Sequence, residues 1–183
     1  MKLRSLDLEI LDQENIPEKD LRSSLSFIRF VNRFLGGTRV ILDYFQAHPV
    51  PEKFRVLDLG CGAGDVAFAL SGWARTQGKQ AEIIGLDLNP FCVQYAGEHF
   101  KAPGLRYVQA SAFDLDSLGE FDYILASMFF HHLKEEEILQ LLTLMARNAR
   151  RGFIVNDLYR SWPAYGAATA LAIPTFCPII LND

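Results

Sequence analysis

The chain has 183 residues, of which 50% are hydrophobic, so it is long enough to form one domain with a sizeable core. Its formal net charge of −4 disfavours nucleic acid as the main partner, because proteins that bind a phosphate backbone present a basic surface. The cysteines have neither metal-binding spacing nor a disulfide framework, and the N-terminus has no apolar signal-peptide core. These features predict a cytoplasmic protein.

The chain begins with a polar stretch, residues 1–20, which we expect to be a mobile arm. Apolar residues then recur at intervals of three and four, which predicts one apolar face of a helix. These residues are Phe27, Phe30, Val31 and Phe34. Gly36 and Gly37 interrupt the pattern, and a second helix is predicted over residues 38–47. Residues 1–50 are therefore predicted to form an N-terminal arm and a helical cap.

From residue 51 onward, strand and helix patterns alternate along the chain. Short apolar runs predict five strands, over residues 54–59, 82–88, 105–110, 121–127 and 153–158. Helices are predicted over residues 65–75, from Pro90, and over residues 135–152. The last of these has acids in its first turn and Arg147, Arg150 and Arg151 before a terminating Gly152. The alternation predicts an α/β fold for residues 51–183, with a Rossmann-like, doubly wound, mostly parallel sheet and helices on both faces.

A glycine-rich turn follows the first predicted strand in the sequence VLDLGCGAGD, residues 56–65. Glycines let the backbone turn sharply and let a ligand approach closely. The dinucleotide fingerprint G-x-G-x-x-G seats a pyrophosphate, but this turn has G-x-G-x-G spacing with Asp58 before it and Asp65 after it. Two carboxylates repel a pyrophosphate, so the turn disfavours a nicotinamide cofactor and favours a cationic, zwitterionic nucleoside. Asp87, at the end of the second strand, either accepts hydrogen bonds from ribose hydroxyls or caps the next helix, and the two roles are compatible.

Four segments in this order resemble the class I S-adenosylmethionine-dependent methyltransferases. They are VLDLGCGAGD, IIGLDLNP, LRYVQASAFDL and FDYILASMFFHHL, all within residues 53–158. The upstream sequence VNRFLGGTRVILDYF is similar to the helix that precedes the domain in small-molecule methyltransferases of quinone biosynthesis. The resemblance implies S-adenosylmethionine as cofactor and a small molecule as methyl acceptor.

The resemblance also implies a role for individual residues. The turn residues Gly60, Cys61, Gly62 and Gly64 would surround the amino-acid end of the cofactor, and Asp58 would contact its methionine part. Asp87 would hold the ribose, Leu88 would pack on the adenine, and Ser111, Ala112 and Phe113 would flank the adenine. Ser127 would lie beside the sulfonium. Many relatives have an acid at the place of Ser111, and a neutral serine accepts a weaker hydrogen bond.

Two candidate catalytic residues follow the fourth and fifth strands, namely His131 and Asp157. Histidine is suited to act as a general base near neutral pH, although His131 could also simply line the pocket. A metal site formed with His132 is disfavoured because adjacent histidines are expected to point apart, so no metal is predicted. Phe129 and Phe130 fit either core packing or the pocket. Cys61 is rejected as a nucleophile because it lies inside the turn and has no histidine near it in sequence.

The predicted activity is methyl transfer to a small-molecule acceptor by in-line displacement. The alternative is a catalytically inactive cofactor-binding module that needs a partner or a further C-terminal segment.

The C-terminal part departs from the family pattern. The family's sheet has seven strands that end in an antiparallel hairpin, whereas only five strands are predicted by Leu158, so the chain is expected to lack the hairpin and to be truncated. The exposed edge of the fifth strand then predicts self-association into a homo-oligomer. Residues 161–181 carry no charge, but three prolines interrupt them, which favours a buried helix and loop over a membrane span.

Overall fold

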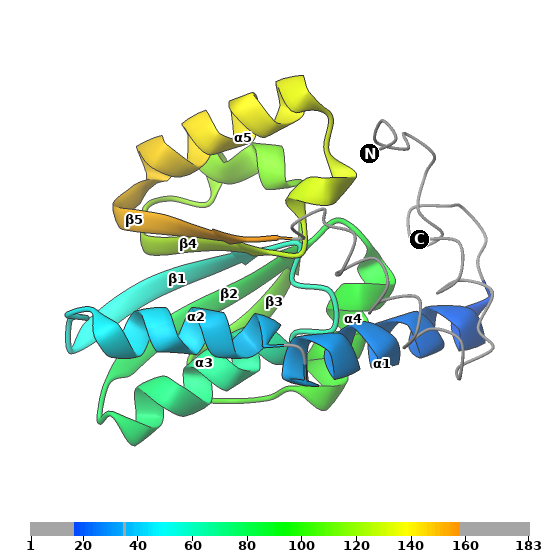
Figure 1. Cartoon of the computed structure of the whole chain (residues 1–183), viewed down its shortest axis with the longest axis horizontal. Coiled ribbons are helices and arrows are strands. Elements are labelled where there is room, and N and C mark those ends of the chain that lie inside the picture. Colours follow the sequence, from blue (N-terminus) through cyan, green and yellow to red (C-terminus); the bar gives the residue numbers. More distant parts are fainter. Residues whose placement is uncertain (1–16, 35, 158–183) are drawn as a thin grey trace.

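The computed structural model describes residues 17–34 and 36–157, which contain a five-stranded sheet with helices on both faces (Figure 1). The strands are β1 (Lys53–Leu59), β2 (Gln80–Asp87), β3 (Leu105–Gln109), β4 (Phe121–Ser127) and β5 (Ala149–Asn156). They are ordered β3-β2-β1-β4-β5, and every neighbouring pair is parallel. The predicted Rossmann-like, doubly wound α/β fold is therefore confirmed.

The helices divide between the two faces of the sheet. They are α1 (Glu18–Phe34), α2 (Gly37–Ala47), α3 (Asp65–Thr76), α4 (Pro90–His99) and α5 (Glu135–Asn148). Two short 3₁₀ helices, η2 (Ala112–Ser117) and η3 (Phe130–His132), complete the described elements. Figure 1 shows α5 on one face of the sheet and α2 and α3 on the other.

Successive residues of the central strands enter different cores because side chains of a strand alternate between the two faces. Leu57 of β1 belongs to the core beneath α5, together with Leu141 and Met145 of that helix. Val56 of β1 belongs to the core beneath α2 and α3, together with Phe45. β1 and β4 are buried on both faces over most of their length, which explains the runs of apolar residues in both strands.

The predicted helix over residues 135–152 is too long. The α5 helix ends at Asn148, and Ala149 already pairs with Phe121 of β4. Arg150 and Arg151 consequently lie in β5 rather than in the last turn of a helix, and Gly152 is a strand residue and not a helix stop. The sequence ARNARRG has good helix formers, but strand pairing overrides that local propensity.

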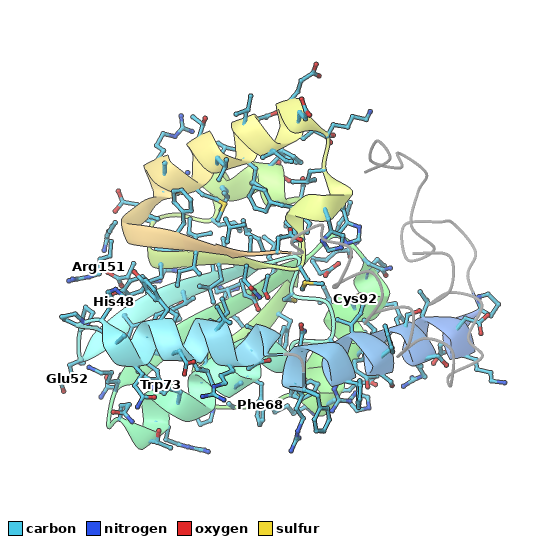
Figure 2. The ribbon with its side chains drawn as sticks, in the orientation of Figure 1. His48, Glu52, Phe68, Trp73, Cys92 and Arg151 are labelled. Carbon is cyan, nitrogen blue, oxygen red and sulfur yellow. The ribbon has the colours of Figure 1, made fainter. Side chains whose placement is uncertain are left out.

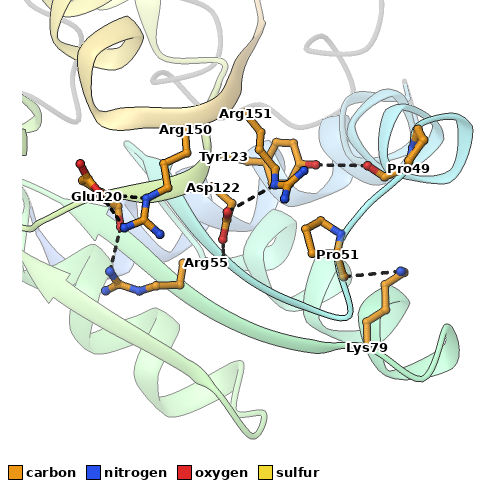
Figure 3. A network of polar contacts seen from close by, with 9 residues as sticks. All are labelled: Pro49, Pro51, Arg55, Lys79, Glu120, Asp122, Tyr123, Arg150 and Arg151. Atoms are coloured by element: carbon orange, nitrogen blue, oxygen red, sulfur yellow. Dashed lines mark hydrogen bonds and ion pairs between the residues drawn. The ribbon is translucent and has the colours of Figure 1, made fainter.

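Arginines and carboxylates form a network at the amino ends of the strands (Figure 3). Arg55 donates from Nε to Glu82 Oε2 at 2.9 Å, and its backbone N–H donates to Asp122 Oδ2 at 2.8 Å. Arg150 Nε donates to Glu120 Oε2 at 2.8 Å, and Arg151 Nε lies 3.4 Å from Asp122 Oδ1. The network borders a hollow of about 330 Å³ lined by residues of β1, β2 and β4.

The helix α1 buries a different face from the one that its aromatic spacing predicts. Phe30 and Phe34 are 44% and 65% exposed, and their rings lie 4.7 Å apart. Among the side chains of α1 whose burial the structure describes, the buried ones are Leu25 and the polar Ser24 and Asn32. Leu25 packs against α4 and the glycine-rich turn, and this contact fixes the rotation of the helix.

Several sequence predictions concern residues outside the described part of the chain. They are the first 16 residues of the predicted polar arm, the absence of the hairpin after Leu158, and the apolar segment 161–181. The end of the arm was predicted wrongly, because α1 begins at Glu18 and residues 18–20 are helical. Of the helices that the structure describes, none has the length and apolar character needed to cross a membrane. The division at residue 50 and a cytoplasmic location stay predictions.

Candidate functional site

The order of the strands places a crevice at the carboxyl end of β1. The chain runs from β1 to β2 on one side, whereas β4 lies on the other side, so the strand order reverses at β1. Ligands of doubly wound sheets bind outside the carboxyl ends of the strands at this switch point. The glycine-rich turn, residues 60–64, follows β1 at that point and leads into α3.

The turn depends on glycine both for its backbone conformation and for its close packing. Gly60 and Gly62 have φ angles of +63° and +49°, which residues with a side chain rarely adopt. A Cβ atom on Gly60 would lie 2.4 Å from the ring of Phe129, and one on Gly64 would lie 2.7 Å from the hydroxyl of Tyr107. Around Gly62, in contrast, no described heavy atom lies within 4 Å of the Cβ position. The turn is therefore packed at both ends and open in the middle, where a ligand can approach the backbone.

Asp58 lies near the end of β1 with only 2% of its surface exposed. Its Oδ2 atom has no hydrogen-bond partner among the residues that the structure describes. Burial raises the pKa of this carboxyl to about 8, and the negative charges of Asp65 and Asp87 contribute to the shift. Asp58 therefore carries a proton for much of the time near neutral pH.

The other two carboxylates near the turn, those of Asp87 and Asp65, accept hydrogen bonds. Asp87 accepts from the backbone N–H of Gly62 at 2.8 Å and from that of Asn89 at 2.9 Å, so it ties the turn to the start of α4. The N-cap of α4 is Asn89 itself, whose side chain accepts from Phe91 N, so the helix-cap interpretation of Asp87 is wrong. Burial raises the pKa of Asp65, whose Oδ2 accepts from Asn32 Nδ2 at 3.3 Å.

This arrangement favours a cation. Within residues 17–34 and 36–157, no ion pair includes Asp58 or Asp65. The charges of Asp65 and Asp87 raise the pKa of the desolvated Asp58, and carboxylates grouped in this way attract a positive group and repel a phosphate. The electrostatics therefore oppose a dinucleotide pyrophosphate at this turn.

The residues expected near an adenine lie at the carboxyl ends of β2 and β3. Leu88 is 70% exposed directly after β2, an apolar surface on which a flat base can pack. Ser111 caps η2 and accepts from Phe113 N at 3.2 Å, while Phe113 is partly buried. Ala112 is only 6% exposed and packs in the core beneath α5, so its side chain supports this region from within.

His131 and Asp157, which the sequence offered as separate candidates, are in direct contact. His131 Nδ1 lies 2.8 Å from Asp157 Oδ1, and the backbone N–H of His131 donates to Asp157 Oδ2 at 3.1 Å. The two hydrogen bonds fix the imidazole ring, and a carboxylate at Nδ1 favours the tautomer with its proton there. That tautomer places the basic lone pair on Nε2.

Ser127 ends β4, a few residues before His131 in the sequence. It is 9% exposed, and its Oγ accepts from Asn156 Nδ2 at 3.1 Å. The following residue, Met128, has a φ of +54°, and its backbone N–H donates to Asn156 O at 2.7 Å. The carboxyl ends of β4 and β5 are therefore linked directly beside the crevice.

The ring side chains that follow β4 differ in part from the sequence expectation. The rings of His131 and His132 lie 4.2 Å apart, so the expectation that they point apart is wrong; the 3₁₀ turn η3 brings them together. In the described part of the chain, no three His, Cys, Asp or Glu side chains are grouped for metal binding. Phe130 is 7% exposed in the core, and Phe129 packs over Gly60.

Cys61 is a packing residue of the turn. It is 7% exposed, and burial raises the pKa of its thiol well above the usual range. Its backbone N–H donates to Leu86 O at 2.9 Å, which joins the turn to β2. A thiol that stays protonated is a poor nucleophile, which supports its rejection in that role.

Two residues of the site escaped the sequence analysis. Tyr107 of β3 donates to Gly64 O at 3.2 Å and lies 3.1 Å from Phe100 O, so it braces the end of the turn. Asn32 of α1 reaches Asp65 at the start of α3. A polar residue on the buried face of a helix would have indicated a role for Asn32. The spacing of the aromatic residues of α1, however, predicted that another face is buried.

The site fits a nucleoside with a positively charged substituent. Asp58 Oδ2 offers a buried acceptor without a partner in the described residues, and the turn that follows is open on the side of Gly62. The exposed Leu88 and the Asp87 carboxylate lie at the next strand, where a base and a ribose can bind.

Comparison with known proteins agrees with this chemistry. A family model described as a methyltransferase domain matches residues 56–152. A ubiquinone biosynthesis O-methyltransferase of Methylococcus capsulatus is 27% identical over 129 residues, which cover 68% of this chain and 52% of that protein. An uncharacterized methyltransferase of Schizosaccharomyces pombe is 26% identical over 113 residues, or 55% of this chain and 38% of that protein. The chain thus spans about half the length, or less, of these two relatives.

Solved structures share the fold. A TehB-like S-adenosylmethionine-dependent methyltransferase from Corynebacterium glutamicum superposes with a TM-score of 0.58 at 22% identity, over 85% of this chain and 84% of that chain. A putative S-adenosylmethionine-dependent methyltransferase from Methanococcus maripaludis gives a TM-score of 0.63 at 13% identity, over 90% and 75% of the two chains.

Proposed function

The chain belongs to the class I S-adenosylmethionine-dependent methyltransferases, and on that premise we propose that it methylates a small-molecule acceptor by in-line displacement. The observation that carries the proposal is the desolvated carboxylate cluster at the glycine-rich turn, in which Asp58 keeps a buried acceptor without a partner in the described residues. When bound, the cofactor supplies an activated methyl group on a positively charged sulfur.

Residues at the carboxyl ends of the strands and in the turn are assigned to different parts of this cofactor. We assign the ammonium group of the zwitterionic amino-acid end to Asp58, and the rest of that end to the open backbone around Gly62. Asp87 is assigned to the ribose hydroxyls, and Leu88, Ser111 and Phe113 to the adenine. We assign Ser127, at the end of β4, to the neighbourhood of the methyl group to be transferred. Such positioning is worth about 7–11 kcal/mol in well-oriented reactions.

His131 is proposed as the general base, with Asp157 as the residue that positions it. Asp157 holds the Nδ1 side of the ring and leaves Nε2 as the nitrogen that accepts a proton. A base is useful only when the acceptor must lose a proton, so the pair favours a hydroxyl acceptor, such as a phenol. The name of the Methylococcus capsulatus relative, an O-methyltransferase, supports an oxygen acceptor.

Two other functions are less well supported. A nicotinamide dehydrogenase would place a pyrophosphate against Asp58 and Asp65. A catalytically inactive module is not favoured, because the residues assigned to both cofactor and base lie at one edge of the sheet.

Self-association is proposed through β5, which forms an outer edge of the described sheet. Phe153 and Val155 of this strand are 39% and 40% exposed, and an exposed apolar edge invites pairing. Light scattering that returns the mass of one chain at every concentration would exclude this part of the proposal.

Calorimetric titration with S-adenosylhomocysteine tests the cofactor assignment. We expect micromolar binding to the wild-type chain and none of NADH at the same concentration. Failure of the folded chain to bind S-adenosylhomocysteine would refute the proposed function, and tighter binding of NADH would revive the dehydrogenase.

The role of His131 is tested with radiolabelled cofactor and a panel of phenolic acceptors. For an acceptor that is methylated, His131→Gln should lower kcat by about 10²–10⁴-fold without changing the Kd for S-adenosylhomocysteine. Asp157→Asn should lower kcat less and shift its pH profile. Unchanged kcat in both variants would show that the pair only lines the pocket.

A further inference from the structure

The helix α1 covers the glycine-rich turn. Leu25 of α1 is fully buried and packs with Ala63 of the turn and with Cys92 and Tyr95 of α4. Figure 1 shows α1 running beside α4 at the end of the sheet where the strands end, and Figure 2 labels Cys92 at this end. The polar residues on the buried face of α1 are therefore close to the site rather than to solvent.

Asn32 is the residue of α1 that reaches the carboxylate cluster. Its side chain is 6% exposed, and its Nδ2 donates to Asp65 Oδ2 at 3.3 Å. An ionised carboxylate only accepts hydrogen bonds, so this contact orients the amide with Oδ1 pointing away from Asp65. A Cβ on Gly37 would lie 2.8 Å from Oδ1, so the start of α2 also confines this oxygen.

The oxygen of Asn32 lacks a donor in the part of the chain that the structure describes. Asn32 Oδ1 and Asp58 Oδ2 are both buried acceptors without a hydrogen bond there. Both residues are linked to Asp65: Asn32 through the hydrogen bond that its Nδ2 donates, and Asp58 through repulsion between the two carboxylates. Leaving two buried acceptors unsatisfied costs free energy, and proteins retain such groups where a ligand supplies the missing donor.

We propose that Asn32 binds the ammonium group at the amino-acid end of the cofactor, together with Asp58. The inference rests on the proposed function, because it concerns the same cofactor. A primary ammonium has three N–H donors and no acceptor, which complements a carboxylate and an amide oxygen. The helix α1 is then part of the cofactor site and not only a cap over the acceptor.

The alternative role for Asn32 is purely structural, as a residue that holds Asp65 and the start of α3. The two roles differ in which ligands they affect. A structural defect changes the affinity for every ligand of the site, whereas a contact with the ammonium matters only for ligands that carry it.

The test compares three ligands on the wild-type chain and on Asn32→Leu. They are S-adenosylhomocysteine, its decarboxylated analogue, which retains the ammonium, and 5′-methylthioadenosine, which lacks the amino-acid end. The substitution should weaken the first two by about tenfold or more and leave the third unchanged. Ser23→Ala, on the exposed side of the same helix, is the matched control, and it should change none of the three affinities.

Equal weakening of all three ligands, or no change in any, would overturn the proposal. Since Asn32→Leu could fail to fold, the side-chain amide of Asn32 is also followed by NMR in the wild-type chain. Its resonances should shift with the two ammonium ligands and stay in place with 5′-methylthioadenosine; the same shift with all three would contradict the assignment. Absence of binding by the wild-type chain would instead refute the proposed function itself.

Discussion

The two ends of the sheet treat carboxylates in opposite ways. At the amino ends, Glu82 is paired with an arginine. Glu120 is also paired with an arginine, and Asp122 receives a backbone N–H and lies beside Arg151 (Figure 3). At the carboxyl ends, Asp58 is buried with an unsatisfied oxygen, and its pKa is raised to about 8. Carboxylates therefore stabilise the fold at the amino ends of the strands, whereas the carboxyl group of Asp58 destabilises it at the carboxyl ends. This difference is expected where the missing partner of Asp58 is a ligand.

The largest expected effect concerns stability as a function of pH. Unfolded Asp58 has an ordinary pKa of 3.8, so between pH 4 and 8 the folded chain binds the extra proton and its stability falls as pH rises. The contribution of Asp58 to this loss is on the order of 5 kcal/mol. Asp58→Asn should therefore be more stable than the wild-type chain at pH 7.5, and about equally stable at pH 4.

Urea unfolding of both chains at these two pH values measures the difference. The Asp58 side chain accepts a hydrogen bond from the backbone N–H of Ala67. This N–H can equally donate to an asparagine oxygen, so the variant retains that hydrogen bond. A variant that is less stable than the wild type at pH 7.5 would mean that Asp58 is not strained by its surroundings.

The second effect concerns binding of the cofactor. The substitution that raises stability, Asp58→Asn, should lower the affinity for S-adenosylhomocysteine. Asp58→Asn removes the negative charge opposite the positive end of the cofactor, which should weaken S-adenosylhomocysteine by about 100-fold. Calorimetry on the stabilised variant measures the Kd. If folded Asp58→Asn bound S-adenosylhomocysteine as tightly as the wild-type chain, Asp58 would not bind the cofactor. The proposed function would then lose the observation that supports it.

The third effect is a proton released on binding. A cation next to Asp58 favours its ionised form, so below pH 8 binding should expel the proton that the folded chain holds there. The Kd should then fall by up to about tenfold per pH unit between pH 6 and 8 and level off above pH 8. Calorimetry in buffers of different ionisation enthalpy counts the protons, and Asp58→Asn serves as the control that should release fewer.

The sequence revealed the site better on the central strands than on the surrounding elements. Asp58, the glycines and Asp87 follow buried apolar runs, and the alternation of strands and helices determines where those runs end. His131 and Asp157 could be named but not paired, because their contact depends on how β4 and β5 align.

The errors have a common physical origin in tertiary contacts. Arg150 and Arg151 looked helical by propensity, but strand pairing with β4 decided their conformation. The aromatic stripe of α1 suggested the wrong face, because Leu25 and Asn32 are positioned by the turn and by Asp65. Local sequence carries no information on these partners, which are distant along the chain.

The smallest expected effect lies at the amino ends and completes the comparison. Glu82→Gln removes the charge opposite Arg55, in a pair whose side chains are 36% and 47% exposed. Exposed pairs contribute little, so the free energy of unfolding should fall by about 0.2–1 kcal/mol. Binding of S-adenosylhomocysteine should not change, because the pair lies near the amino ends of β1 and β2, whereas the turn follows the carboxyl end of β1. A clear loss of binding in Glu82→Gln would show that the two ends of the sheet are coupled, and the division between a stabilising end and a binding end would then fail.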